Sequence, residues 1–271
     1  MSQQGLVDSH CHLDFNVFNI DRAEVIGRAR EAGLVRMINP GIDIPTSKTA
    51  LGLAGQYPEV YAAVGIHPNE VQSLDFDQDG ILRHFLEQDK VVAIGEIGLD
   101  YFRQRTARDL QVKAFEVQLE LASEASLPVI VHNREASQDI LEILTTWQAS
   151  LKLSDPVLAS CPGVLHSYSG TIEEAWQAIE MGFLIGITGP VTFKKAVDLQ
   201  YLVSILPLES LIVETDAPFL TPHPWRGKRN EPSYVRYTAE KIANLRGDSF
   251  EHVAEVTTAN AFRLFHGRSF L

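Results

Sequence analysis

Short apolar runs rich in β-branched residues recur along the whole chain, and each is followed by a more polar segment. About eight such runs occur, and their continuous apolar character is typical of strands buried on both faces of a parallel sheet. The predicted strands span residues 6–7, 34–39, 60–66, 91–96, 128–132, 163–166, 183–186 and 211–214.

Stretches with apolar residues at three- and four-residue steps lie between several of these runs and predict helices. Thr171 and Glu174 have the spacing of a capping box at the start of one helix, and Gly33 suits the position just after another. The predicted helices span residues 21–32, 108–126, 135–147 and 171–180, and residues 234–271 predict two more.

Strand–helix alternation repeated about eight times predicts an α/β fold, a (β/α)8 TIM barrel with extra C-terminal helices. A doubly wound open sheet is the alternative, and it is disfavoured because no G-x-G-x-x-G motif follows the first strand. No linker, repeat or low-complexity segment interrupts the pattern, so we expect residues 1–271 to form a single domain.

The composition, 45% hydrophobic and 21% charged, is that of a globular protein. Two cysteines, Cys11 and Cys161, exclude a disulfide scaffold and suit a reducing compartment. We see no secretory signal, and the least polar stretch, residues 183–193, is too short to cross a bilayer. We therefore expect a cytoplasmic protein that does not enter a membrane.

The formal net charge of −12 argues against wrapping long nucleic acid across a broad basic face. It does not exclude a small site at which bound metal ions attract phosphate.

Histidines and carboxylates gather at the ends of the predicted strands, which in a barrel form the face that carries the active site. Alternation along the first strand points His10 and His12 the same way and Cys11 towards the helices. An isolated H-x-H pair would fit a surface loop, but the recurrence at other strand ends predicts a divalent metal site. The residues at these ends are His10, His12, His67, Glu96, His132, His166, Glu214 and Asp216.

Seven short motifs together carry a resemblance that covers nearly the whole chain. They are DSHCHLD at 8–14, GIHP at 65–68, GEIGLDY at 95–101, PVIVH at 128–132, HSYSG at 166–170, ETDAP at 214–218 and NAF at 260–262. By these motifs the chain resembles the TatD family of metal-dependent deoxyribonucleases, within the amidohydrolase-like metallohydrolases. It departs from the family pattern at Asn133, where Ser or Cys is frequent, and at Tyr168, where Phe is common.

The resemblance implies two divalent metal ions, Mg²⁺, Mn²⁺ or Zn²⁺. His10, His12 and Asp216 would hold one of them, His132 and His166 the other, and Glu96 would bridge both. Many related barrels bridge their metals with a carbamylated lysine instead. No lysine occurs between Lys90 and Lys113, so Glu96 is the bridge that the fourth strand end can supply, which favours phosphoester over amide hydrolysis.

We assign Glu96, Asp216 and His67 to catalysis. Asp216 would accept the proton of the attacking water, and His67 would donate to a phosphate oxygen or to the leaving group. We expect Glu214, with Asp8 and Asp14, to support the site from behind the ligands.

Substrate contacts are expected from residues that follow the strands. His67 and Arg134 would bind phosphate, Arg134 in a bidentate manner. Tyr101, Phe102 and Trp225 would stack on bases, although burial against a helix fits these rings equally well. The basic run 226–230 would steer a polyanion or simply form a solvated loop.

The function that the resemblance implies is 3′→5′ exonucleolytic cleavage at DNA ends, with DNA or another phosphoester as a transient partner. We expect a monomer or a weak homo-oligomer. The alternative is a metal-dependent ester or amide hydrolase, such as a D-aminoacyl-tRNA deacylase, and a third possibility is a binding protein with a structural metal.

Overall fold

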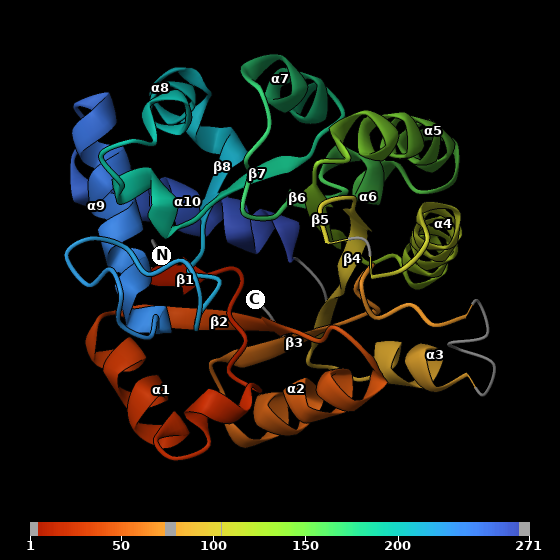
Figure 1. Ribbon diagram of the computed structural model, residues 1–271, viewed down its shortest axis with the longest axis horizontal. Coiled ribbons are helices and arrows are strands. Elements are labelled where there is room, and N and C mark those ends of the chain that lie inside the picture. The colour runs from red at the N-terminus through yellow and green to blue at the C-terminus, as the bar shows by residue number, and fades with distance from the viewer. Residues whose placement is uncertain (1–4, 74–79, 104, 266–271) are drawn as a thin grey trace.

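Eight parallel strands follow one another around a ring in the order of the sequence (Figure 1). This arrangement is seen in a computed structural model that describes residues 5–73, 80–103 and 105–265. The strands are β1 (Leu6–Asp8), β2 (Leu34–Pro40), β3 (Val60–Val64), β4 (Val91–Asp100), β5 (Val129–Arg134), β6 (Gly163–Leu165), β7 (Leu184–Ile187) and β8 (Leu211–Val213).

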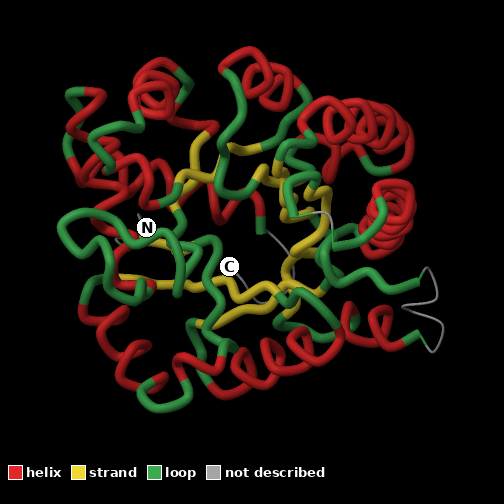
Figure 2. Tube along the Cα trace, in the orientation of Figure 1, coloured by secondary structure: helices red, strands yellow, loops and turns green. Residues whose placement is uncertain are grey.

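Helices surround the strands on the outside (Figure 2) and complete the predicted (β/α)8 TIM barrel. They are α1 (Arg22–Glu31), α2 (Ile44–Gln56), α3 (Ile81–Leu86), α4 (Arg108–Ala125), α5 (Ser137–Ser154), α6 (Pro156–Ser160), α7 (Ile172–Glu180), α8 (Val197–Ile205), α9 (Val235–Arg246) and α10 (Phe250–Leu264). The two extra C-terminal helices are α9 and α10, so that prediction is also confirmed. In the described part of the chain, no helix has the length and apolar character needed to span a membrane.

Local signals account for several helix ends. At the start of α7 the Thr171 side chain accepts the Glu174 N–H, and the Glu174 carboxylate accepts the Thr171 N–H, as the capping box predicts. Helix α5 continues to Ser154, beyond the predicted end at residue 147, because its buried face extends to Leu151.

The described residues form two large hydrophobic cores. The larger one fills the layer between the strands and the outer helices. The second lies inside the barrel, where Ile38, Ile130 and Ile212 from different strands meet Leu264 and Phe265 at the end of α10. Figure 1 shows α10 crossing behind the ring of strands, so this helix closes one end of the barrel interior.

The seam between β1 and β8 is joined beyond the ends of these two short strands. The Asp216 N–H donates to the His10 carbonyl at 2.9 Å. The Thr215 N–H and hydroxyl both donate to the buried Asp8 carboxylate, at 2.9 and 2.6 Å. The barrel is therefore closed at the residues that were predicted to hold a metal.

Strands β4 and β5 form a much longer ladder, with Gly98, Leu99 and Asp100 paired to His132, Asn133 and Arg134. Gly98 has a φ of 134°, and a Cβ atom at this position would collide with the His132 carbonyl. Glycine thus permits the close approach that places the β4 and β5 side chains next to each other.

Candidate metal centre

His10 and His12 follow β1, and their rings lie on the same side of the chain, as the alternation predicted. Both rings are buried, and their Nε2 atoms lie 3.1 Å apart. Cys11 points the other way and is buried with its Sγ 3.5 Å from the Ile38 carbonyl. The H-x-H pair therefore presents two imidazole nitrogens to one point.

Glu96 extends from the middle of β4 and faces imidazoles with both of its oxygens. Its Oε2 lies 3.6 Å from His10 Nε2 and 3.7 Å from His12 Nε2. Its Oε1 lies 2.7 Å from His132 Nδ1 and 4.0 Å from His166 Nε2. Burial raises the pKa of Glu96, but hydrogen bonds from His10 and His132 outweigh it and keep the pKa well below the usual range. The carboxylate is thus charged although it is buried.

Asp216 completes the cluster from the segment after β8. Its backbone is left-handed, with a φ of 53°, a conformation in which Asp is enriched and which often occurs at functional sites. Its Oδ1 lies 3.5 Å from His12 Nε2 and 3.8 Å from the Nε2 atoms of His10 and His166. Three imidazoles therefore surround one carboxylate oxygen.

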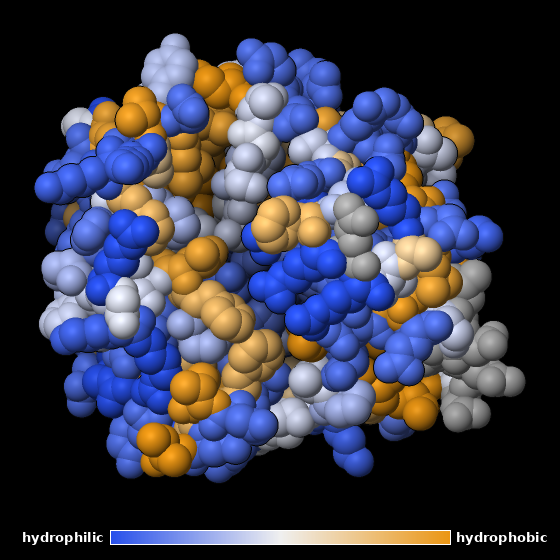
Figure 3. Space-filling view, viewed as in Figure 1, coloured by the Kyte–Doolittle hydropathy of each residue, from blue (hydrophilic) through white to orange (hydrophobic). Residues whose placement is uncertain are grey.

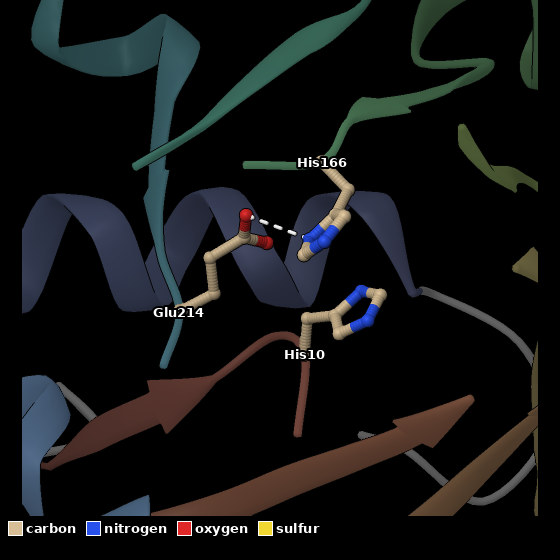
Figure 4. A group of neighbouring side chains, drawn as sticks. All are labelled: His10, His166 and Glu214. Atoms are coloured by element: carbon tan, nitrogen blue, oxygen red, sulfur yellow. Dashed lines mark ion pairs between the residues drawn. The ribbon is translucent and has the colours of Figure 1, made fainter. Parts of the chain in front are cut away.

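His166 is held from behind by Glu214 (Figure 4). The Glu214 Oε1 lies 2.9 Å from His166 Nδ1 and also accepts the Ser167 N–H, while Oε2 accepts the Ser9 hydroxyl at 3.3 Å. The His166 ring stacks on His10, with their centroids 3.5 Å apart. Glu214 therefore orients His166 so that its Nε2 faces the cluster, as expected of a supporting residue.

His132 has a comparable support in Asp100, which belongs to the GEIGLDY motif but was not among the predicted site residues. Asp100, at the end of β4, places its Oδ2 3.4 Å from His132 Nε2. The Asn69 side chain donates to the same oxygen at 2.7 Å, and the Arg103 N–H donates to the other one at 2.8 Å. Nδ1 of His132 is the nitrogen that remains for the cluster.

His67 lies at the edge of the cluster, with its Nε2 3.9 Å from Glu96 Oε1 and its ring packed on His132. Burial lowers the pKa of His67 to about 3, so the ring is neutral at neutral pH. Its Nδ1 accepts the Asn69 N–H at 3.1 Å, which leaves the ring proton on Nε2. His67 can therefore donate a hydrogen bond towards the centre of the site.

The donor set fits divalent metal ions. Imidazole nitrogens and carboxylate oxygens are the ligands of Zn²⁺, Mn²⁺ and related ions, and here they converge in three groups that are linked by His10 and Glu96. Burial lowers the pKa of His166, but Glu214, Asp216 and Glu96 raise it to about 10. The field that stabilises a protonated imidazole also attracts a metal cation. All six residues predicted as metal ligands lie in this one cluster.

The residues predicted to contact substrate divide into two kinds. Phe102 is 55% exposed, and the half-buried Arg134 places its guanidinium carbon 4.0 Å from the centre of that ring. Tyr101 is 7% exposed, its hydroxyl donates to Asp139 and the Arg108 guanidinium lies over its ring. Burial of this ring is the alternative that the sequence left open, and stacking of Tyr101 on substrate stays a prediction that its burial disfavours.

The basic run after β8 is likewise divided. Arg229 is bound to Asp21, with nitrogen–oxygen distances of 2.9 and 2.6 Å. Arg226 instead lies over Phe193 and, together with Lys194 and Lys195, lines a pocket of about 600 Å³. No motif or periodicity in the sequence indicated the two lysines.

Comparisons with known proteins agree with this geometry. A family model described as TatD related DNase matches residues 7–266. The uncharacterized metal-dependent hydrolase YabD of Bacillus subtilis (strain 168) is 41% identical over 262 residues, which cover 96% of this chain and 98% of that protein. The 3′-5′ ssDNA/RNA exonuclease TatD of Erwinia tasmaniensis is 37% identical over 267 residues, covering 96% and 100%. The crystal structure of YjjV, a TatD homologue from Escherichia coli K12, superposes with a TM-score of 0.86 at 31% identity, covering 97% of this chain and 99% of that one.

Proposed function

Because the chain belongs to the TatD family of DNases, we propose that it is a divalent-metal-dependent phosphodiesterase that releases nucleotides from the 3′ end of single-stranded DNA. The exonuclease named for the Erwinia relative includes RNA, which makes RNA a second polymer to test.

One observation carries the proposal: the two oxygens of Glu96 face different pairs of histidines. Oε2 faces His10 and His12, and Oε1 faces His132 and His166. We assign His10, His12 and Asp216 to one metal ion, His132 and His166 to a second, and Glu96 to both. When bound, two divalent ions lower the pKa of a water molecule and offset the charge of a phosphodiester.

The protein's own groups move and hold the protons. Burial raises the pKa of Asp216, but a hydrogen bond from His12 and the charges of the nearby imidazoles keep it below the usual range. The carboxylate is therefore free of its proton and able to take one from the attacking water. His67 is neutral, with its ring proton on Nε2, and would donate a hydrogen bond to a phosphate oxygen or to the departing 3′ oxygen.

The rim of the site supplies positive charge despite the net charge of −12. Arg134 lies at the end of β5, and Lys194, Lys195 and Arg226 line a pocket formed by the segments after β7 and β8. These groups attract phosphates of the strand over a short range, because salt screens them beyond about 10 Å. They favour brief engagement of a strand end over tracking along long DNA.

The test is release of mononucleotides from a 3′-labelled single-stranded oligonucleotide by protein loaded with Mg²⁺, Mn²⁺ or Zn²⁺. We expect release that a chelator abolishes and that Asp216→Asn and Glu96→Ala both eliminate. Elemental analysis of each variant reports metal content independently of activity.

A parallel panel uses bis-p-nitrophenyl phosphate, aryl esters and aminoacyl esters. Cleavage of the carboxylic esters without release from DNA would replace the phosphodiester assignment with the ester alternative. No metal bound at all would contradict the site itself.

A further inference from the structure

A second pocket lies directly beside the histidine cluster. It has a volume of about 630 Å³, which is within the range of small-molecule sites, and Phe15 and Phe219 form its aromatic walls. Their ring centroids are 5.8 Å apart and their planes meet at 80°. Phe219 is 51% exposed, so about half of its surface is accessible to a ligand.

This pocket shares its walls with the candidate metal centre. The Phe15 ring stacks on His12, with their centroids 4.7 Å apart. The Phe219 N–H donates to the Asp216 carbonyl at 2.8 Å. Each phenylalanine follows a predicted metal ligand by three residues. A chemical group attached to a phosphate at the cluster would therefore lie next to the pocket.

The charges around the pocket indicate what it binds. Arg229 is part of its lining, but its guanidinium is bound to Asp21 and to the Val17 carbonyl. Asp14 is buried and accepts the side-chain amide of Asn39 at 2.8 Å. The pocket thus offers aromatic faces and a neutralised cation, which suits a flat uncharged ring better than a phosphate.

The pocket lined by Lys194, Lys195 and Arg226 has the opposite electrostatic character. Within the described residues these three cations form no ion pair, and both lysines are exposed. That pocket therefore suits phosphates. The contrast favours binding of an uncharged ring in the pocket of Phe15 and Phe219 and of phosphates in the pocket of Lys194, Lys195 and Arg226.

The surface agrees with this division. On the face shown in Figure 3, a band of hydrophobic side chains runs beside the central hollow, over the segments that follow β1 and β8 in Figure 1. Exposed apolar side chains in this region include Val17, Ile20 and Phe219.

We propose that the pocket of Phe15 and Phe219 receives the nucleobase of the 3′-terminal nucleotide, stacked on Phe219 with Phe15 at its edge. The inference rests on the proposed function, because the terminal phosphodiester must lie at the metal centre. Every base can stack on an aromatic ring, so this subsite binds the strand end without discriminating between sequences.

The experiment compares two single-stranded oligonucleotides that differ in whether the 3′-terminal nucleotide carries a base or is abasic. We expect the metal-loaded protein to cleave the base-bearing end with a kcat/KM about 5- to 100-fold higher, the range of a base–aromatic stack. Phe219→Ala is expected to reduce the ratio of the two kcat/KM values towards one, whereas Phe219→Tyr keeps it. Tyr201→Ala serves as the matched control, because Tyr201 is an exposed aromatic residue of α8 outside the pocket.

Binding provides a readout apart from catalysis. Titration calorimetry compares thymidine 5′-monophosphate with 2-deoxyribose 5-phosphate, and Phe219→Ala is expected to weaken the nucleotide alone. Equal cleavage of the two ends by the unmodified protein would overturn the subsite while supporting the exonuclease assignment. No release from either end would overturn the exonuclease assignment, and the subsite with it.

Discussion

The two sides of the metal centre are built in different ways. On one side, Glu96 and His132 lie within β4 and β5, whose backbones are paired by the longest ladder of the barrel. On the other side, His10, His12 and Asp216 lie just beyond three-residue strands, at the seam where the barrel closes. We call these the ladder side and the seam side.

The comparison shows where positional accuracy comes from. On the ladder side, His132 is paired with Gly98 and the Glu96 N–H donates to the Gly41 carbonyl at 2.8 Å. We expect these backbone contacts to keep both residues in place when a single side-chain contact is lost.

On the seam side, hydrogen bonds of side chains contribute more to the positions of the ligands. Thr215 donates to the Asp8 carboxylate, and the Asn230 amide donates to the Thr215 carbonyl at 2.9 Å. Substitutions behind the ligands should therefore harm the seam side more.

The largest effect is expected from Glu96→Gln on the ladder side. The change removes the negative charge of a carboxylate whose two oxygens face different histidine pairs, so metal content falls and nuclease activity drops by about 1000-fold or more. The variant keeps its fold, which circular dichroism checks. Glu116→Gln on the exposed surface of α4 is the control. Full metal content in Glu96→Gln would contradict the bridging role.

The next effect is expected from Thr215→Val on the seam side. It removes the hydroxyl that donates to Asp8 and accepts the Ala217 N–H, while the side-chain volume stays the same. The loss of a buried donor should lower the free energy of unfolding by about 1–3 kcal/mol. Because the seam positions His10 and Asp216, metal affinity should fall by about 10- to 100-fold.

Thr49→Val, on the exposed face of α2, provides the matched control for denaturant titration and metal titration. If both variants behave alike, the seam does not depend on this hydroxyl.

Asn69→Ala tests the ladder side in the same manner. Asn69 donates to Asp100, which in turn lies beside His132. Because β5 already fixes His132, we expect metal affinity to fall by less than about 10-fold, the lower limit for supporting residues of this kind. A loss equal to that of Thr215→Val would remove the distinction between the two sides.

The smallest effect concerns pH and the ion pair between Asp21 and Arg229, which ties the segment after β8 to the start of α1. Hydrogen bonding to Arg229 lowers the pKa of Asp21. A lowered carboxyl pKa contributes stability above its unfolded value of about 4, and this contribution is lost as the pH falls through the folded value.

The pair is partly exposed, so we expect at most about 1 kcal/mol. Thermal unfolding between pH 6 and pH 3 measures it. The midpoint difference between the unmodified protein and Asp21→Asn should shrink as the pH falls, and a constant difference would show that the pair contributes through packing instead.

The same two sides show what the sequence could predict. Strand ends meet on one face of a barrel, so the histidines, Glu96 and Asp216 could be grouped from the order of strands alone. The roles of Tyr101 and Phe102 depended on where β4 ends. The predicted strand stopped at residue 96, but β4 continues to Asp100, after which Tyr101 is buried and Phe102 is exposed.

Features formed by loops could not be predicted from the sequence, for a different reason. Phe15 and Phe219 meet because the segments after β1 and β8 fold against each other, and no periodicity describes such segments. Lys194 and Lys195 line one pocket with Arg226 because the segments after β7 and β8 meet, and the Thr192 hydroxyl accepts the His223 N–H between these segments at 2.9 Å.

The closing helix has a consequence for the order of biosynthesis. A ribosome delivers β1 first, and β2 to β5 can pair while later residues are still being added. The apolar interior stays open until α10 brings Leu264 and Phe265, and the seam waits for β8. The centre takes residues from the segments that follow β1 and β8, so we expect nascent chains to acquire metal only after Asp216 has emerged.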